Sequence, residues 1–278
     1  MPTRFLLLIG LLIPTALLRA QPSPEDALRA GLVAHPQADT ARVDQLIRLA
    51  DVVRPNNYVE ALELGQEALL LSRKINYPAG EANALLAVGS AYGERNDYAS
   101  ALRYLNQARQ RFDQQRDRAG MADVTGQIGW ISTQQGEYVS ALSFGLQSLD
   151  LAEALRDSSL IRRQIAMLGA LYTLLGDYTQ ALTYYTSALE QYEQAHREAG
   201  VCKVLNGIGE VYRYQGDMPR AIRYYKKAIR LARALNNTRL EAETQSNLAA
   251  AYVQQYQYGQ GLFIGLLALR VMLAKGQY

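Results

Sequence analysis

Few residues in this 278-residue chain carry the chemistry of a catalytic or metal site. His35 and His196 are the only histidines and lie far apart, and Cys202 is the only cysteine. A Ser-His-Asp arrangement or a two-histidine metal site needs such groups close together, and a disulfide needs a second thiol. No phosphate loop or dinucleotide fingerprint is found either. The sequence therefore predicts no enzyme, metal or cofactor, and we expect Cys202 to be a small buried apolar residue.

Charged residues of the two signs nearly balance, with 29 Lys and Arg against 26 Asp and Glu. Such a chain lacks the concentrated positive charge on which nucleic-acid binding depends. One exception is a run of six cations without an intervening acid. We interpret it as the solvated outer face of a helix, with docking of anionic lipid or an acidic partner as the alternative. The six are Arg220, Arg223, Lys226, Lys227, Arg230 and Arg233.

A repeat of forty residues organises the chain. A fixed period of this size is typical of stacked supersecondary units, which present an extended surface rather than a deep catalytic pocket. Two columns of small residues keep the forty-residue step: Gly89, Gly129, Gly169 and Gly209, followed by Ala249, and Ala101, Ala141, Ala181 and Ala221, followed by Gly261.

Each unit is expected to contain two helices joined by a tight turn. Between residues 162 and 200, apolar side chains recur at spacings of three and four, as on one face of a helix. Gly176 ends the first helix and Asp177 caps the second, since glycine favours helix ends and aspartate favours helix starts. The same turn recurs at Asn96-Asp97, Gly136-Glu137 and Gly216-Asp217.

The unit resembles the tetratricopeptide repeat. Its signature is a small residue, an aromatic residue three positions on, an alanine near the start of the second helix and another alanine seven positions later, here Gly169, Tyr172, Ala181 and Ala188. The family unit has about 34 residues, so this chain looks like a long-helix variant. The resemblance implies an all-α, right-handed superhelical solenoid of about six antiparallel helix pairs.

Three segments are expected along the chain. Residues 1–20 read as a signal peptide, with Arg4 before an apolar run and Ala20 at a cleavage point, although an ordinary buried helix is the alternative. Residues 21–40 are expected to be a partly ordered lead-in. The array then covers residues 41–275, and Leu49 replaces the glycine in its degenerate first unit. The units lie near 42–81, 82–121, 122–161, 162–201, 202–241 and 242–275.

In proteins that this chain resembles, one side of the first helices lines a concave groove that holds peptides. Trp130, the only tryptophan, stands there in a column of small or polar residues, so it is either an anchor for a partner or packed against a neighbouring helix. The cations and the amide near it could hold a carboxylate or an acidic peptide. The alternative is a solvated face on which Glu210 and Asp123 compensate the charge. The predicted partner-binding residues are Trp130, Arg163, Lys203, Asn206, Glu210 and Arg213.

The segment from Gly261 to Leu273 is apolar almost all round, yet too short to cross a bilayer, which takes about 20 residues. The last element of a solenoid normally needs a polar outer face. We therefore expect the chain either to continue beyond it or to cover it with a protein partner, a second copy or a membrane surface. The contacting residues would be Phe263, Leu266, Leu267 and Val271.

The sequence is compatible with two functions. The first is an exported scaffold, periplasmic or in the cell envelope, whose groove binds a protein or peptide segment. The second is the input region of a membrane-bound signalling protein, similar to histidine kinases or related regulators, with its output domain absent from this chain. A third function, that of a cytoplasmic adaptor, would require that residues 1–20 are not a signal peptide.

Overall fold

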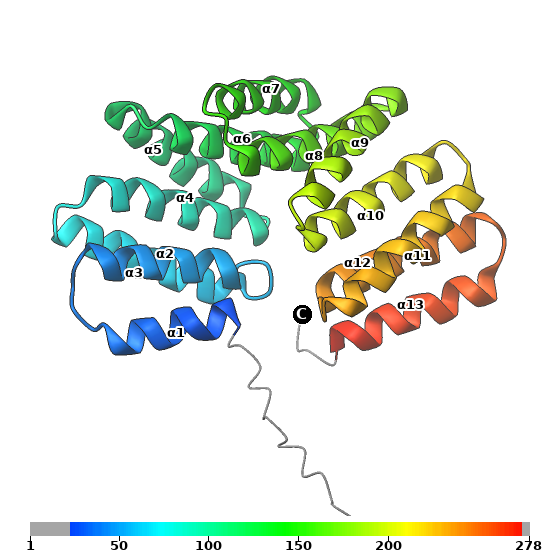
Figure 1. Cartoon of the computed structure of the whole chain (residues 1–278), viewed down its shortest axis with the longest axis horizontal. Helices are drawn as coiled ribbons and strands as arrows, with labels where there is room; N and C mark the ends of the chain where they lie inside the picture. Colours follow the sequence, from blue (N-terminus) through cyan, green and yellow to red (C-terminus); the bar gives the residue numbers. More distant parts are fainter. Residues whose placement is uncertain (1–22, 274–278) are drawn as a thin grey trace, which may run out of the picture.

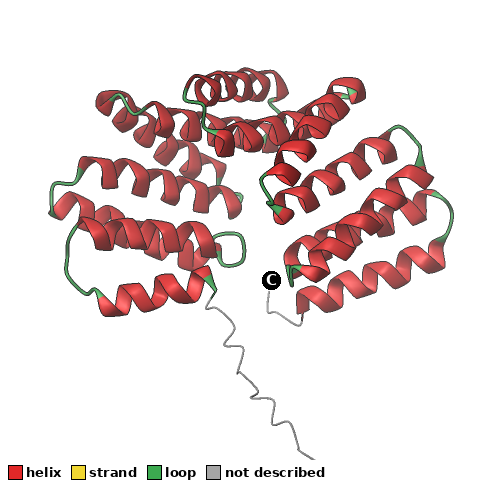
Figure 2. Cartoon of the chain, viewed as in Figure 1, coloured by secondary structure: helices red, strands yellow, loops and turns green. Residues whose placement is uncertain are grey.

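The computed structural model describes residues 23–273, which form thirteen α-helices and no strand (Figures 1 and 2). The signal peptide expected at residues 1–20 lies outside the described residues. After α1, the helices follow as six antiparallel pairs, so the all-α solenoid expected from the repeat is confirmed. Their bounds are α1 Pro24–Ala34, α2 Thr40–Val53, α3 Tyr58–Lys74, α4 Pro78–Glu94, α5 Tyr98–Gln115, α6 Arg118–Gln134, α7 Tyr138–Ala154, α8 Ser158–Leu175, α9 Tyr178–Gln194, α10 Glu198–Tyr214, α11 Met218–Ala234, α12 Thr238–Gln254 and α13 Tyr258–Leu273.

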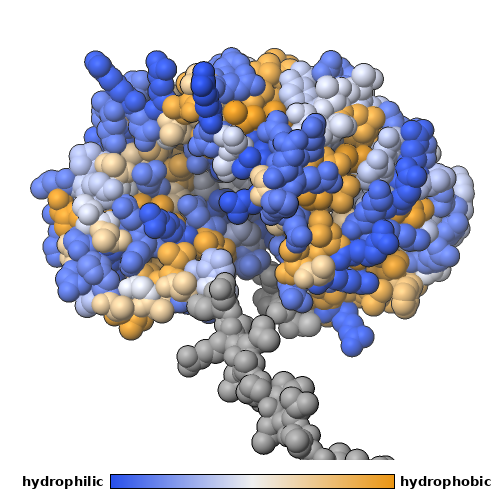
Figure 3. Space-filling model, viewed as in Figure 1, coloured by the Kyte–Doolittle hydropathy of each residue, from blue (hydrophilic) through white to orange (hydrophobic). Residues whose placement is uncertain are grey.

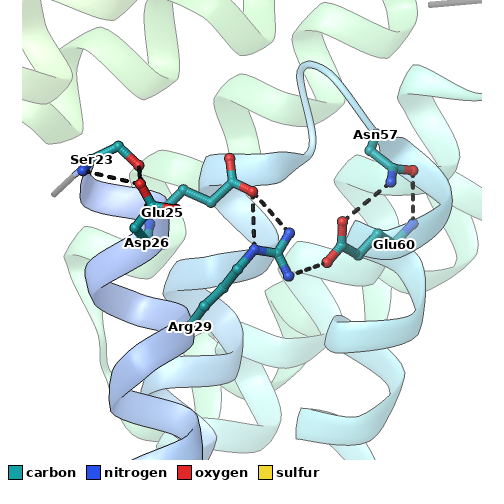
Figure 4. Close-up of polar contacts among 6 residues, drawn as sticks. All are labelled: Ser23, Glu25, Asp26, Arg29, Asn57 and Glu60. Atoms are coloured by element: carbon teal, nitrogen blue, oxygen red, sulfur yellow. Dashed lines mark hydrogen bonds and ion pairs between the residues drawn. The ribbon is translucent and has the colours of Figure 1, made fainter. Parts of the chain in front are cut away.

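Helix α1 occupies much of the segment in which the sequence indicated only a partly ordered lead-in. Ser23 and Asp26 form a capping box at its start, each side chain accepting a hydrogen bond from the other's backbone. Arg29 then bridges Glu25 of the same helix at 2.8 Å and Glu60 of α3 at 2.7 Å (Figure 4). This helix therefore docks on the first pair of the array.

The turns inside the pairs have the predicted geometry. Gly136, Gly176 and Gly216 adopt positive φ angles of 78°, 79° and 81°, a region that glycine enters without steric cost. The residue after each of these glycines is the N-cap of the next helix. Asp177 and Asp217 accept a backbone hydrogen bond from the third residue of that helix, which satisfies a group left free at helix starts.

The glycine column exists because a side chain of the second helix packs directly against it. A Cβ atom at Gly209 would lie 2.7 Å from Cε1 of Tyr225, and one at Gly169 would lie 2.8 Å from Cδ1 of Tyr185. Beside this contact Tyr212 stacks on Tyr224 with ring centroids 5.5 Å apart. The ring stacking repeats between Tyr92 and Tyr104 and between Tyr172 and Tyr184.

The pairs stack into an arch whose two arms approach each other at their ends (Figure 1). Helix α6 lies on the inner side of α7, so the first helices face the interior of the arch. Arg239, at the start of α12, reaches the opposite arm, where it donates to the carbonyl oxygen of Pro55 and lies 3.3 Å from Oε2 of Glu94. The array thus makes nearly one closed turn around a central hollow.

Helix α13 exposes apolar side chains on its outer face. Phe263 and Leu266 are exposed as expected, at 62% and 56%. Leu267 and Val271, which were expected on the same surface, are half-buried, because the helix turns them back toward the body. The rest of the exposed apolar face is Leu262, Leu269 and Leu273.

Candidate functional site

The inner surface of the arch holds a cavity of about 260 Å³ formed by consecutive first helices. Figure 3 shows mainly hydrophilic side chains around the central hollow to which this surface belongs. Helices α4, α6 and α8 contact one another in sequence, so residues from neighbouring units meet there. The lining residues are Arg54, Glu94, Asp123, Gly126, Gln127, Trp130, Arg163, Gln164 and Met167.

Trp130 of α6 has two roles in this wall. One edge of its indole packs on α4, where a Cβ atom at Gly93 would lie 2.7 Å from Cζ3 of the tryptophan. The remainder of the half-buried ring lines the cavity. The interpretation in which Trp130 packs against a neighbouring helix is therefore confirmed for one edge of the ring, and its role as an anchor for a partner stays a prediction.

Arg163 of α8 lines the same cavity, but an acid already compensates its charge. Its guanidinium lies 2.6 Å from Oδ1 of Asp123, one repeat earlier on α6. This pairing matches the interpretation in which Asp123 balances the charge of the face. About half of the Arg163 side chain is still exposed, so it remains accessible from the groove.

Gln164 is the polar group at the floor of the cavity. Its side chain is only 2% exposed and packs against Gly126, where an added Cβ atom would come within 2.6 Å of Nε2. Its amide oxygen has no hydrogen-bond partner among the described residues. A buried carbonyl without a partner costs about 1–3 kcal/mol, which a donor entering the cavity would recover.

The remaining predicted residues lie on α10, outside the lining of this cavity. Lys203 is exposed, whereas Asn206 is buried and accepts a hydrogen bond from Nδ2 of Asn247 on α12 at 3.1 Å. Arg213 is half-buried with its guanidinium carbon 4.4 Å from the centre of the Tyr214 ring. The structure therefore separates the six predicted residues into a cavity pair, Trp130 and Arg163, and an α10 group.

Electrostatics in the α10 group are dominated by partial burial. Burial raises the pKa of Glu210, with Arg213 opposing the shift and Glu243 adding to it. Burial likewise raises the pKa of Tyr225, whose hydroxyl has no hydrogen-bond partner within residues 23–273. The α10 group therefore carries a partly desolvated acid beside a cation.

Sequence reasoning missed Gln164, Arg54, Glu94 and Met167. A signal existed for Gln164, because its column five positions before the glycine otherwise reads Ala84, Val124, Val204 and Thr244. A glutamine in a buried and mostly apolar column indicates a polar requirement at that place. Arg54 and Glu94 sit at helix ends, one period apart in a column that continues as Gln134, Leu174, Tyr214 and Gln254, and so varied a column gave no signal.

Residues 23–273 show no candidate metal site and no candidate membrane-spanning helix. No group of three or more His, Cys, Asp or Glu side chains there is arranged to hold a metal ion. No described helix has both the length and the apolar character needed to cross a bilayer. Cys202 is fully buried, as expected.

Comparisons with known proteins agree with the repeat and the fold. The family model for the tetratricopeptide repeat matches residues 162–234 and 200–260. No curated protein matches the sequence. Among solved structures, the chain is similar to BtubC from P. vanneervenii, with a TM-score of 0.59, 19% identity, and coverage of 86% of this chain and 94% of that one.

Two similar structures are complexes. A Rap protein complexed with Competence and Sporulation Factor gives a TM-score of 0.73 at 14% identity, covering 89% of this chain and 68% of that one. NprR in complex with its cognate peptide NprX gives 0.66 at 16% identity, covering 90% and 75%. Residues 162–260 therefore match the tetratricopeptide repeat model, and residues 23–273 share the helical solenoid fold of these structures.

Proposed function

We propose that this protein is a scaffold whose inner groove binds an extended peptide or protein segment. The observation that carries the proposal is the cavity between α4, α6 and α8, which is lined by both half-buried Trp130 and buried Gln164 with its unpartnered amide oxygen. The amide oxygen would accept a hydrogen bond from a backbone N–H group of the bound segment. The indole ring of Trp130 would cover one side chain of that segment. That NprR binds a peptide on a similar solenoid supports this assignment.

Arg163 and the α10 group would extend the contact along the groove. An acidic side chain or carboxylate of the segment would compete with Asp123 for Arg163, while the Asn206–Asn247 pair offers further amide groups. The mixture of cations and acids along this wall favours a segment with mixed charge over a uniformly acidic one.

The experiment uses Trp130 as its own reporter, because no other tryptophan contributes to the emission. Peptides selected from a random displayed library on the whole chain would be titrated while tryptophan fluorescence is recorded. We expect saturable binding that Gln164→Leu weakens about tenfold, the equivalent of about 1.4 kcal/mol. The matched control is Gln147→Leu on the outer face of α7, where Gln147 is exposed. Equal affinities for both variants, or no selected peptide that perturbs Trp130, would contradict the proposal.

We further propose that the scaffold acts outside the cytoplasm, on the strength of the leader read from residues 1–20. A fusion of the native N-terminus to alkaline phosphatase, which is active only after export, tests this. Loss of phosphatase activity on changing the apolar run to polar residues would support export, and inactivity of the native fusion would refute it.

The input region of a signalling protein is the second candidate, favoured by the exposed apolar face of α13. Such a face suits a following segment that packs on it. Reading the codons beyond Tyr278 for a hydrophobic run of about 20 residues and an output domain would separate the two candidates.

A further inference from the structure

A second and larger cavity of about 570 Å³ lies at the C-terminal end of the array, between α11, α12 and α13. It shares no lining residue with the groove cavity. Its volume falls within the range of about 300–1,000 Å³ that is typical of small-molecule sites. At this end of the molecule, Figure 3 shows hydrophilic side chains directly beside hydrophobic ones.

The floor of this cavity is apolar. Ile222 and Ile229 come from α11, Leu248 from α12 and Ile264 from α13. Ile229 and Leu248 are almost completely buried, at 6% and 3%. Three helices therefore supply aliphatic side chains to one surface, which would cover an alkyl chain but offers nothing to a polar ligand.

The rim is positively charged and largely uncompensated. Arg223, Lys226 and Arg230 line it from α11, and within the described residues none forms an ion pair with a carboxylate. The fourth rim cation, Arg233, lies 2.7 Å from Glu241 and is neutralised. Lys226 is held 5.7 Å from the centre of the Tyr252 ring, which keeps its charge next to the opening.

Gln245 of α12 adds a buried polar group with unused capacity. Its side chain is 1% exposed, and its Nε2 atom donates to Glu241 at 2.9 Å. Its amide oxygen, in contrast, has no partner among the described residues. Because the glutamine lines the cavity, the missing donor is expected to come from an occupant, and a hydroxyl group is the simplest one.

We propose that this cavity binds a single-chain anionic amphiphile with a hydroxyl group near its head. The alkyl chain lies on Ile222, Leu248 and Ile264, the anionic head meets Lys226 and Arg230, and the hydroxyl donates to Gln245. The outer basic helix is then part of a ligand site and is more than a solvated face. The site is independent of the peptide groove and does not rest on it.

Calorimetric titration of the whole chain with 3-hydroxydodecanoate, kept below its critical micelle concentration, tests this proposal. The double variant Lys226→Ala, Arg230→Ala is expected to weaken binding at least tenfold. The matched control, Arg220→Ala with Lys227→Ala, removes the same charge from the same helix at residues that do not line the cavity. All four side chains are exposed, but Arg220 is also ion-paired with Asp217, so the helical circular dichroism of both variants must match that of the native chain before affinities are compared. Equal losses in both variants would mean general attraction to the basic face and would overturn the site.

Two further probes separate the parts of the proposal. Dodecyltrimethylammonium has the same chain length with opposite charge, and binding of similar strength would refute an anionic head group. Plain dodecanoate should bind more weakly than its hydroxylated analogue, and Gln245→Leu should abolish that difference. Equal affinities of the native chain for the two acids would refute the role of Gln245.

A filling variant tests the location. Ile264→Trp should occupy the cavity and remove binding while the helical circular dichroism remains native. Retained binding in this variant, or binding to anionic vesicles without any binding of the monomeric acid, would place the interaction on the surface and contradict the proposal.

Discussion

Tyr225 and Gly209 show, at the scale of single residues, why a repeat column is small. The tyrosine ring of α11 fills the place where a β-carbon on α10 would stand, at 2.7 Å from Cε1. The ring is fully buried and belongs to the core with Leu248 and Ala251. A buried ring of this size cannot move aside without disturbing that packing.

Gly209→Ala is therefore expected to destabilise the chain by about 1–3 kcal/mol, the usual cost of overpacking a rigid core. Urea unfolding followed by circular dichroism measures it. Gly259→Ala is the control, since an added β-carbon there meets nothing within 4 Å and alanine favours a helix. If the Gly209→Ala variant were as stable as the native chain, the Tyr225 ring would have to shift at no cost to make room for the added methyl group.

Glu210 provides a pH-dependent test of the α10 group. Because burial raises its pKa in the folded state, the folded chain binds more protons than the unfolded chain between the ordinary and the raised pKa. Its contribution to stability is therefore lost as pH rises through this window, and the carboxylate is a net cost at neutral pH.

The Glu210→Gln variant should be more stable than the native chain at neutral pH. This gain in the free energy of unfolding should vanish below the ordinary glutamate pKa of about 4.3. Thermal unfolding of both chains across this range is the measurement. A variant that is less stable than the native chain at neutral pH would show that the attraction of Arg213 outweighs burial.

At the scale of elements, the sequence predicted what depends on neighbours along the chain. The turn at Gly176-Asp177 follows from glycine at positive φ and aspartate at a helix start, and both are local preferences. The side chain that meets each glycine, Tyr185 or Tyr225, depends on how two helices cross, which spacing alone does not give. The cavity around Gln164 is formed where helices from different units meet, which the sequence of one unit does not show. The only sequence signal for this cavity is the glutamine itself, which stands in an otherwise mostly apolar column.

The apolar face of α13 carries the prediction at this scale. Leu262 and Phe263 are 67% and 62% exposed, and a face of this kind on a terminal helix favours association. We expect the purified chain to self-associate with rising concentration, as followed by light scattering during gel filtration. Phe263→Lys with Leu266→Lys should keep it monomeric. Native chain that stays monomeric at high concentration would exclude this face as a contact between copies.

The whole molecule is an arch closed by one side chain from each arm. Its curvature arises from a small rotation at every unit, and such rotations accumulate into contacts between residues far apart in sequence. Arg239 meets Glu94 at 3.3 Å although 145 positions separate them, and Glu94 also lies 3.6 Å from Arg54. No repeat column indicated this contact, because it is set by the sum of the rotations.

This link is expected to control the width of the groove more than the stability of the fold. Partly exposed ion pairs contribute only about 0–1 kcal/mol, whereas the arms of a solenoid flex easily. Arg239→Ala should therefore raise the radius of gyration in small-angle X-ray scattering and leave the unfolding midpoint nearly unchanged. High salt should expand the native chain in the same way, since it screens the pair, and should leave the variant unaffected. Arg118→Ala, an exposed arginine at the start of α6, is the control that should keep the native radius. If Arg239→Ala left the radius unchanged, the arms would be held by the stiffness of the stacked pairs alone, and the entrance to the groove would have a fixed width.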